Sequence, residues 1–223
     1  MTDVAAFDFD GTLTAGGSVF GFLTAVTDRR TVLAASLALA PRLVHAAIAG
    51  GHTADRTKEL LFERVLAGMP VHHIEDVAGR YGAEHLAANL RADVRDRFEW
   101  HRARGDRLVI VSASPELYVR VAGDRLGADE VIATRLAVDE QGILTGRYQG
   151  SNCRGEEKLR RLQQWIEVSG TPPGRLWAYG NSRGDLRMLR FADVGVDVGR
   201  LGPVGRLRSF PRLDQTGPDG TCR

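Results

Sequence analysis

The sequence has little cysteine. Only Cys153 and Cys222 occur among 223 residues. Small disulfide-stapled domains need more cysteine than this, so no disulfide framework is expected, and the chain suits a reducing cytosol. The chain runs from Met1 straight into the apolar residues 4–7, without the basic segment, long apolar stretch and cleavage site of a secretion signal. We therefore expect a cytoplasmic protein.

A large excess of one charge is also lacking. The 30 Lys and Arg residues nearly balance the 28 Asp and Glu residues, for a formal net charge of +2. This balance argues against a nucleic-acid partner. Arginines do gather towards the C-terminus, where a solvated surface is preferred to a polyanion-binding patch: Arg200, Arg206, Arg208, Arg212 and Arg223.

Long uninterrupted apolar runs are absent. The nearest approach is residues 31–50, which Pro41, Arg42 and His45 interrupt. A membrane-spanning helix needs about 20 predominantly apolar residues without a central charge. A packed pair of helices is therefore favoured for this stretch, and a helix lying on a membrane surface is left open but not favoured.

What is present is the composition of a folded protein, 43% apolar and 26% charged. Three short apolar runs, each ending in a polar loop, are typical of buried parallel strands: Val4–Phe9, Leu108–Val111 and Leu176–Tyr179. Helical patterns cover Asp93–Arg104, Pro115–Leu126 and Glu156–Val168. This alternation predicts an α/β fold, a Rossmann-like, doubly wound parallel sheet that binds ligands at the carboxyl ends of its strands.

The first two strands are separated by about 80 residues with helical periodicity, far more than a crossover needs. We therefore expect a core of residues 1–16 and 91–212, an inserted helical cap of residues 17–90 after the first strand, and a flexible tail of residues 213–223. Residues 132–148 look like a hairpin, with a Gly-containing loop at 139–142.

Four polar segments carry the candidate chemistry. Asp8-Phe9-Asp10-Gly11-Thr12 leaves the first strand, and carboxylates two residues apart can reach one pocket, as a nucleophile with an acid/base group or as a divalent-metal site. The other segments are Ser112-Ala113-Ser114-Pro115, Gly155-Glu156-Glu157-Lys158 and Gly180-Asn181-Ser182-Arg183-Gly184-Asp185. Ser114 before Pro115 is also a good helix N-cap candidate.

In this order the segments resemble the four motifs of the haloacid dehalogenase-like hydrolases. The residues within them are most similar to the subfamily that includes phosphoserine phosphatase. The resemblance implies that Asp8 is the nucleophile, Asp10 the acid/base and Lys158 the neutralising cation. It implies phosphate contacts from Gly11, Thr12, Ser112, Ala113 and Lys158. It also implies a Mg²⁺ site formed by Asp8, Asp10, Asn181 and Asp185.

One position departs from the family pattern. Asn181 stands where an aspartate is usual. An amide oxygen can still bind Mg²⁺, but the site loses one negative charge, so weaker metal binding or slower turnover is expected.

The predicted function is a Mg²⁺-dependent phosphomonoester hydrolase that forms an aspartyl-phosphate and acts on a small metabolite, as a monomer or homodimer. Two alternatives stay open: a phosphatase for a lipid headgroup at a membrane surface, and a catalytically weak protein that binds a phosphorylated ligand.

Substrate specificity should reside in the cap. Phosphoserine phosphatases usually carry a cap glutamate soon after the first motif, and residues 15–20 contain none, which disfavours phosphoserine as the substrate. Candidates to meet a substrate are Ser18, Phe20, Phe22, Arg56, Lys58 and Arg64.

Overall fold

The computed structural model describes residues 2–170, 172–199 and 210–217. Its centre is a five-stranded parallel sheet in the order β3-β2-β1-β6-β7. The strands are β1 (Val4–Phe7), β2 (Arg107–Pro115), β3 (Glu130–Thr134), β6 (Leu176–Gly180) and β7 (Val194–Asp197). The predicted α/β fold with a parallel sheet is therefore confirmed.

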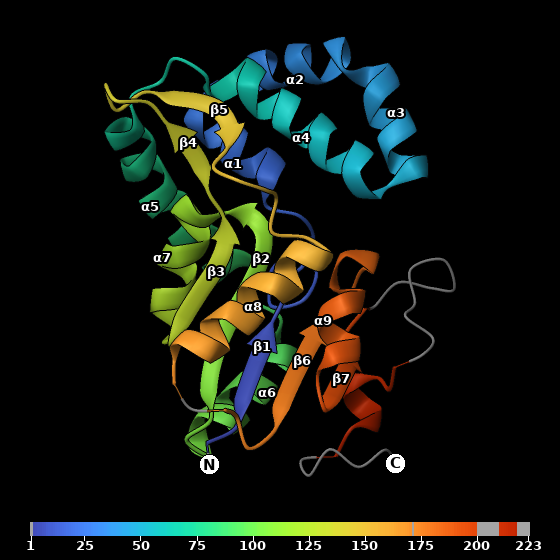
Figure 1. Ribbon diagram of the computed structural model, residues 1–223. Coiled ribbons are helices and arrows are strands. Elements are labelled where there is room, and N and C mark those ends of the chain that lie inside the picture. Colours follow the sequence, from blue (N-terminus) through green and yellow to red (C-terminus); the bar gives the residue numbers. More distant parts are fainter. Residues whose placement is uncertain (1, 171, 200–209, 218–223) are drawn as a thin grey trace.

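Helices cover both faces of the sheet (Figure 1). Because side chains alternate along a strand, Ala5 and Phe7 pack on one side with Phe98, while Val4 and Ala6 pack on the other with Leu162. The covering helices are α6 (Ala92–Ala103) and α7 (Glu116–Leu126) on the first face, and α8 (Glu156–Val168) and α9 (Leu186–Phe191) on the second. A 3₁₀ turn, η1 (Arg183–Asp185), precedes α9.

The insertion between β1 and α6 is helical, as expected. It consists of α1 (Val19–Val26), α2 (Arg29–Ala38), α3 (Ala40–Ala49), α4 (Gly51–Leu66) and α5 (Val71–Asn89). Figure 1 places α2, α3 and α4 beyond the carboxyl ends of the sheet strands, at the far end from the chain's N-terminus. Among the helices of the described residues, none is long and apolar enough to cross a membrane.

The predicted hairpin is only partly correct. Its first half divides: residues up to Thr134 extend the main sheet as β3, and only β4 (Leu136–Val138) pairs with β5 (Leu144–Tyr148). The hairpin packs against the inserted helices, because the amide of Gly68 donates to Leu144 O at 2.9 Å and that of Val71 to Gly142 O at 2.9 Å. The cap is thus built from two separate stretches of chain.

The segment expected to form a flexible C-terminal tail is described in part. Residues 213–217 include a short 3₁₀ turn, η2 (Leu213–Gln215), and Thr216 is buried. Arg97 of α6 donates to the carbonyl oxygen of Thr216 at 2.8 Å, so this part contacts the core. Residues 218–223, including Cys222, lie outside the described residues, as do Arg200, Arg206, Arg208 and Arg223 of the arginine cluster.

Candidate active site

The site is built where β1 ends, next to β6. The amide of Asp8 donates to Tyr179 O at 2.9 Å, which continues the sheet ladder and holds the residue at the carboxyl end of the strand. Its carboxylate accepts from Lys158 Nζ at 2.7 Å and from the Thr12 hydroxyl at 2.9 Å. Asp8 is 6% exposed, so it is a nearly buried carboxylate with an ordered position.

Lys158 joins three of the four motifs. Its ammonium lies 2.7 Å from Asp8 Oδ1 and 2.6 Å from Asp185 Oδ1, and the side chain is 2% exposed. The lysine comes from the first turn of α8. A charged group is almost never fully buried unless it is paired, and here two carboxylates pair with it.

Burial and charge shift the pKa values of this pair in a consistent way. Burial, together with repulsion from Asp185, raises the pKa of Asp8 to about 7 against the opposing attraction of Lys158. Burial alone would lower the pKa of Lys158, but the carboxylates of Asp185 and Asp8 outweigh it and raise that pKa above its ordinary value. Lys158 is therefore a permanent cation, and the carboxylates around it still carry an excess of negative charge.

Asp185 pins the loop that contains Asn181. Its second carboxylate oxygen accepts from the amides of Asn181 and Ser182 at 3.2 and 3.0 Å and from the Ser182 hydroxyl at 2.8 Å. With Lys158 on the first oxygen, the carboxylate of Asp185 is fully engaged inside the protein. This geometry favours a positioning role for Asp185 over direct metal ligation.

Asp10 faces the cap. One carboxylate oxygen accepts from the Ser18 amide at 2.7 Å and the other from the Ser114 hydroxyl. The prediction that Ser114 caps the following helix is wrong: Pro115 still belongs to β2, and α7 starts at Glu116 without a side-chain cap. Asp10 is thus held from both sides, by the start of the cap and by the second motif.

Ser112 lies at the carboxyl half of β2 and is 1% exposed. Its hydroxyl oxygen accepts from the Ser114 amide at 3.0 Å. Because that contact uses an oxygen lone pair, the hydroxyl proton is left to donate elsewhere. A phosphoryl oxygen is an acceptor that this proton could reach once a substrate is bound.

The turn after β1 depends on Gly11. Its φ is +76°, and a Cβ there would lie 2.0 Å from Asn181 Nδ2, so only glycine lets the first and fourth motifs meet. The Thr12 amide donates to Phe9 O at 3.2 Å and its hydroxyl to Asp8. Thr12 therefore supports the nucleophile candidate, with its amide already used inside the turn.

The structure adds a residue that sequence reasoning missed. Arg91, just before α6, is 6% exposed, and its Nη1 donates to Gly11 O and to Val198 O, both at 2.7 Å. It links the first-motif turn to the segment after β7. No motif marks this arginine, because its role depends on contacts 80 and 107 positions away in the chain.

Of the cap residues expected to meet a substrate, two reach the site. Ser18 contacts Asp10, and Lys58 Nζ donates to Ala113 O and to Asn152 Oδ1, each at 2.8 Å. The other four do not: Phe22 is buried against Tyr118 and Tyr81, Arg56 pairs with Glu59 and Glu63, and Phe20 and Arg64 are exposed.

Lys58 and Lys158 are the only lysines among the 30 basic residues of the chain. Both ammonium groups lie at this site, one on the second motif and one on the nucleophile candidate. Burial lowers the pKa of Lys58 to about 8 although Asp55 and Asp10 oppose the shift. This distribution is a sequence signal that distinguishes Lys58 from the arginines Arg56 and Arg64 among the predicted cap candidates.

We predict that Lys58 is a positioning residue. Lys58 and the Thr134 hydroxyl both donate to Ala113 O, at 2.8 and 2.7 Å, and this fixes the peptide whose N–H contacts Ser112. Lys58→Met should lower kcat about tenfold and change KM less, since the hydroxyl proton of Ser112 loses its fixed direction. Steady-state kinetics and melting curves would measure this.

Arg64→Met is the matched control, because Arg64 is an exposed cation on the same helix. Thr134→Val should act in the same direction as Lys58→Met, since it removes the other donor to Ala113 O. Equal kcat values for Lys58→Met and Arg64→Met would contradict the positioning role.

The residues at this site fit a divalent cation. Asp8 and Asp10 bring two carboxylates, while that of Asp185 is engaged by Lys158 and by the Asn181 loop. Among the described residues, no cluster of three or more His, Cys, Asp or Glu side chains is arranged to hold a metal. An ion here would be coordinated by the Asp8 carboxylate, the amide oxygen of Asn181, a backbone carbonyl oxygen and water. All of these ligands are oxygen atoms, which Mg²⁺ prefers.

The site brings together groups that suit a phosphorylated ligand. A buried carboxylate, a permanent cation and hydroxyl donors surround one point at the switch between the two halves of an α/β sheet. The sequence profile of the haloacid dehalogenase-like hydrolases matches residues 5–190, and the chain belongs to that family.

Similar proteins agree with this assignment. The chain is 36% identical to Protein CicA of Caulobacter vibrioides over 85% of this chain and 83% of the relative. It is 33% identical to a phosphoserine phosphatase of Lactococcus lactis, with 62% of each chain covered. The protein is a phosphatase of the haloacid dehalogenase-like class.

Solved structures share the fold at lower identity. A Bordetella pertussis protein of unknown function has a TM-score of 0.78 at 22% identity, covering 95% of this chain and 98% of the other. A phosphoserine phosphatase, solved as a phospho-aspartyl intermediate analogue, has a TM-score of 0.63 at 19% identity, covering 88% and 86%.

Proposed function

We propose that the protein is a Mg²⁺-dependent hydrolase of a small phosphorylated metabolite and acts through an aspartyl-phosphate on Asp8. The observation that carries this proposal is the bridge from Lys158 to Asp8 and Asp185, which orients the Asp8 carboxylate at the carboxyl end of β1. The phospho-aspartyl analogue of a phosphoserine phosphatase with the same fold supports it.

The proposed reaction has two steps. An Asp8 carboxylate oxygen attacks phosphorus in line, the bond from phosphorus to the leaving oxygen breaks, and Asp10 gives its proton to the departing alkoxide. Asp10 then takes a proton from water, which attacks the phosphorus of the aspartyl-phosphate and releases phosphate. The carboxylate of Asp8 is restored.

The other side chains act on charge and orientation. Ser112 would donate to one phosphoryl oxygen and Lys158 would neutralise another, while Thr12 keeps Asp8 in its attacking rotamer. A bound Mg²⁺, held by Asp8, Asn181 and backbone carbonyl oxygen of Asp10, would supply charge neutralisation of the phosphoryl group. Ser18 and Ser114 keep Asp10 directed towards the space below the cap.

The substrate is proposed to be small, because Asp8, Ser112 and Lys158 are nearly buried and the cap contacts the core through Lys58. Phosphoserine itself is not favoured. Residues 15–20 supply no glutamate, and within them the Ser18 amide donates to Asp10 while the Ser18 hydroxyl contacts the Tyr118 hydroxyl. The leaving group would therefore lack the amino group that such a glutamate recognises.

A magnesium titration tests both the proposed hydrolysis and the effect of having Asn181 where the family usually has an aspartate. Asn181→Asp is isosteric, so it fits against Gly11, and it adds one negative charge. The Mg²⁺ concentration for half-maximal hydrolysis of an aryl phosphate should fall about tenfold or more, because a unit charge near the ion strengthens its binding by at least about 1.4 kcal/mol. Phosphate release against Mg²⁺ concentration measures this.

Asn181→Ala is the matched control and should need more Mg²⁺ than the wild type, since it removes the amide oxygen. Absence of turnover at every Mg²⁺ concentration in both the wild type and Asn181→Asp would favour a protein that binds a phosphorylated ligand and does not hydrolyse it. An unchanged half-saturation point in Asn181→Asp would exclude Asn181 as a ligand.

A further inference from the structure

The outer cap face, defined here as α2, α3 and the first turn of α4, exposes aliphatic side chains. Leu37, Val44 and Ile48 are 72%, 63% and 80% exposed, and Leu33 is 43% exposed. Within each helix the pair is four residues apart, so Leu33 with Leu37 and Val44 with Ile48 each form one stripe. Apolar exposure concentrated in this way marks an interaction surface, whereas single exposed residues do not.

The charge of the same segment has one sign. Between Asp28 and Asp55 the sequence contains no Asp or Glu, whereas the whole chain has 28 of them. The exposed ionisable side chains of this stretch are basic: Arg29, Arg30, Arg42, His45 and His52. Among the described residues, Arg42, His45 and His52 make no ion pair with a carboxylate, in contrast to Arg56, which pairs with Glu59 and Glu63.

A cavity of about 440 Å³ opens in this face between α3 and α4. Its lining contains basic groups and hydroxyls and no carboxylate: Arg42, His45, His52, Thr53, Arg56, Thr57 and Leu60. The Thr57 hydroxyl already donates to Thr53 O at 2.8 Å, and Arg56 pairs with Glu59 and Glu63. Among the described residues of this lining, Arg42 is the guanidinium with no carboxylate partner, and such a group is suited to a phosphate. The face thus combines exposed aliphatic stripes with a basic hollow.

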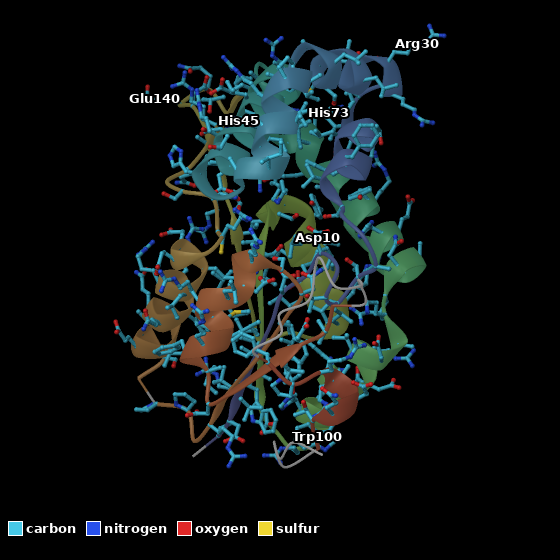
Figure 2. The ribbon with its side chains drawn as sticks, turned by 90° about the vertical axis from the view of Figure 1, so that its right-hand side faces the viewer. Asp10, Arg30, His45, His73, Trp100 and Glu140 are labelled. Carbon is cyan, nitrogen blue, oxygen red and sulfur yellow. The ribbon has the colours of Figure 1, made fainter. Side chains whose placement is uncertain are left out.

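The outer cap face lies away from the sheet. In Figure 2, Arg30 and His45 are at the cap end of the molecule, and Asp10 lies where cap and core meet. A second cavity of about 530 Å³ shares His52 and Arg56 with the first and continues between α4 and the start of α8 to Asn152 and Gly155. The basic hollow therefore borders a cleft that reaches the start of α8, where Glu156 and Glu157 also line it.

We propose that the outer cap face docks on an anionic phospholipid bilayer. Leu37, Val44 and Ile48 enter the headgroup boundary, and Arg30, Arg42 and the basic cavity contact lipid phosphates. An amphipathic surface with basic flanks and aliphatic residues is the arrangement that binds such interfaces. The proposal concerns binding alone, so it stands or falls independently of the proposed reaction.

Vesicle co-sedimentation of the full chain tests the docking. The protein should pellet with vesicles of phosphatidylcholine and phosphatidylglycerol, stay in the supernatant with phosphatidylcholine alone, and be released by high salt. Two variants, Leu37→Ser/Val44→Ser/Ile48→Ser and Arg30→Glu/Arg42→Glu, should each lower the partition coefficient about tenfold or more. Hydrolysis of a soluble aryl phosphate and melting curves would report folding of each variant.

Val168→Ser and Arg125→Glu are the matched controls, because they change an exposed aliphatic residue and an exposed arginine on core helices. They should bind vesicles like the wild type. A wild-type protein that stays in the supernatant with anionic vesicles would overturn the proposal, as would a triple-serine variant that still pellets. A concentration-dependent dimer lost in the triple-serine variant, without vesicle binding, would assign the face to a second copy of the chain.

Discussion

Asp8→Asn should lower kcat at least about a thousandfold. An amide oxygen is a poor nucleophile towards phosphorus, so the covalent step is lost while the shape of the side chain is kept. Thr12 can still donate to the amide oxygen, and Lys158 keeps its contact with Asp185. Phosphate release with saturating Mg²⁺ and a melting curve would measure activity and folding together.

Asp3→Asn is the control for this change. Asp3 lies at the opposite end of β1, where its carboxylate pairs with Arg104 at 3.0 Å. This variant should retain kcat. A folded Asp8→Asn protein with more than about 1% of the wild-type rate would end the case for an aspartyl-phosphate on this residue.

Lys158→Met should remove both activity and stability. Two buried carboxylates, on Asp8 and Asp185, would lose the ammonium that lies 2.7 and 2.6 Å from them. Deleting one partner of a buried ion pair costs about 3–5 kcal/mol of unfolding free energy, since the remaining charge is uncompensated. Because the same lysine would neutralise the phosphoryl group, kcat should fall at least about a hundredfold.

Denaturant unfolding in the absence of Mg²⁺ and steady-state kinetics in its presence separate the two effects. Arg160→Met, on the exposed side of the same helix, should change the unfolding free energy by less than about 1 kcal/mol, because its pair with Glu157 is at the surface. If Lys158→Met unfolds like Arg160→Met, the buried bridge contributes little to stability.

The catalytic candidates could be predicted from the sequence because each motif is local. Asp8 and Asp10 follow a buried strand. Lys158 lies in the first turn of a helix, and only the resemblance to the hydrolase family distinguished it from a solvent-facing lysine. Parallel strands bring their carboxyl ends to one edge, so the strand pattern alone predicts that these loops meet. The contacts between Lys158, Asp8 and Asp185 agree with that expectation.

Features that depend on tertiary contacts could not be predicted. Ser114 was predicted to cap a helix because it precedes Pro115. In the structure β2 continues through both residues, and the Ser114 hydroxyl donates a hydrogen bond to the Asp10 carboxylate. Arg91 carries no motif, and its importance comes from two carbonyl groups brought together by the fold. Local sequence patterns do not predict hydrogen-bond partners that are distant in the chain.

Sheet membership was harder to predict than strand formation. Residues 132–148 have the periodicity of a hairpin, yet the chain changes sheet at Arg135, between β3 and β4. The edge strand β7 was not predicted at all, because its four residues contain Gly195 and Asp197, which weaken a strand pattern. Pairing with β6 stabilises it in the fold.

The hairpin β4–β5 lies against α4 although it belongs to the second half of the chain. Its Gly146, with φ of +75°, sits so close to α4 that an added Cβ would be 2.4 Å from the Glu63 Cα. A chimaera that transplants substrate preference between relatives therefore has to carry both the helical insertion and this distant ribbon. If the insertion alone were moved, its helix α4 would pack against the recipient's own hairpin. That contact leaves no space for a side chain at the position of Gly146.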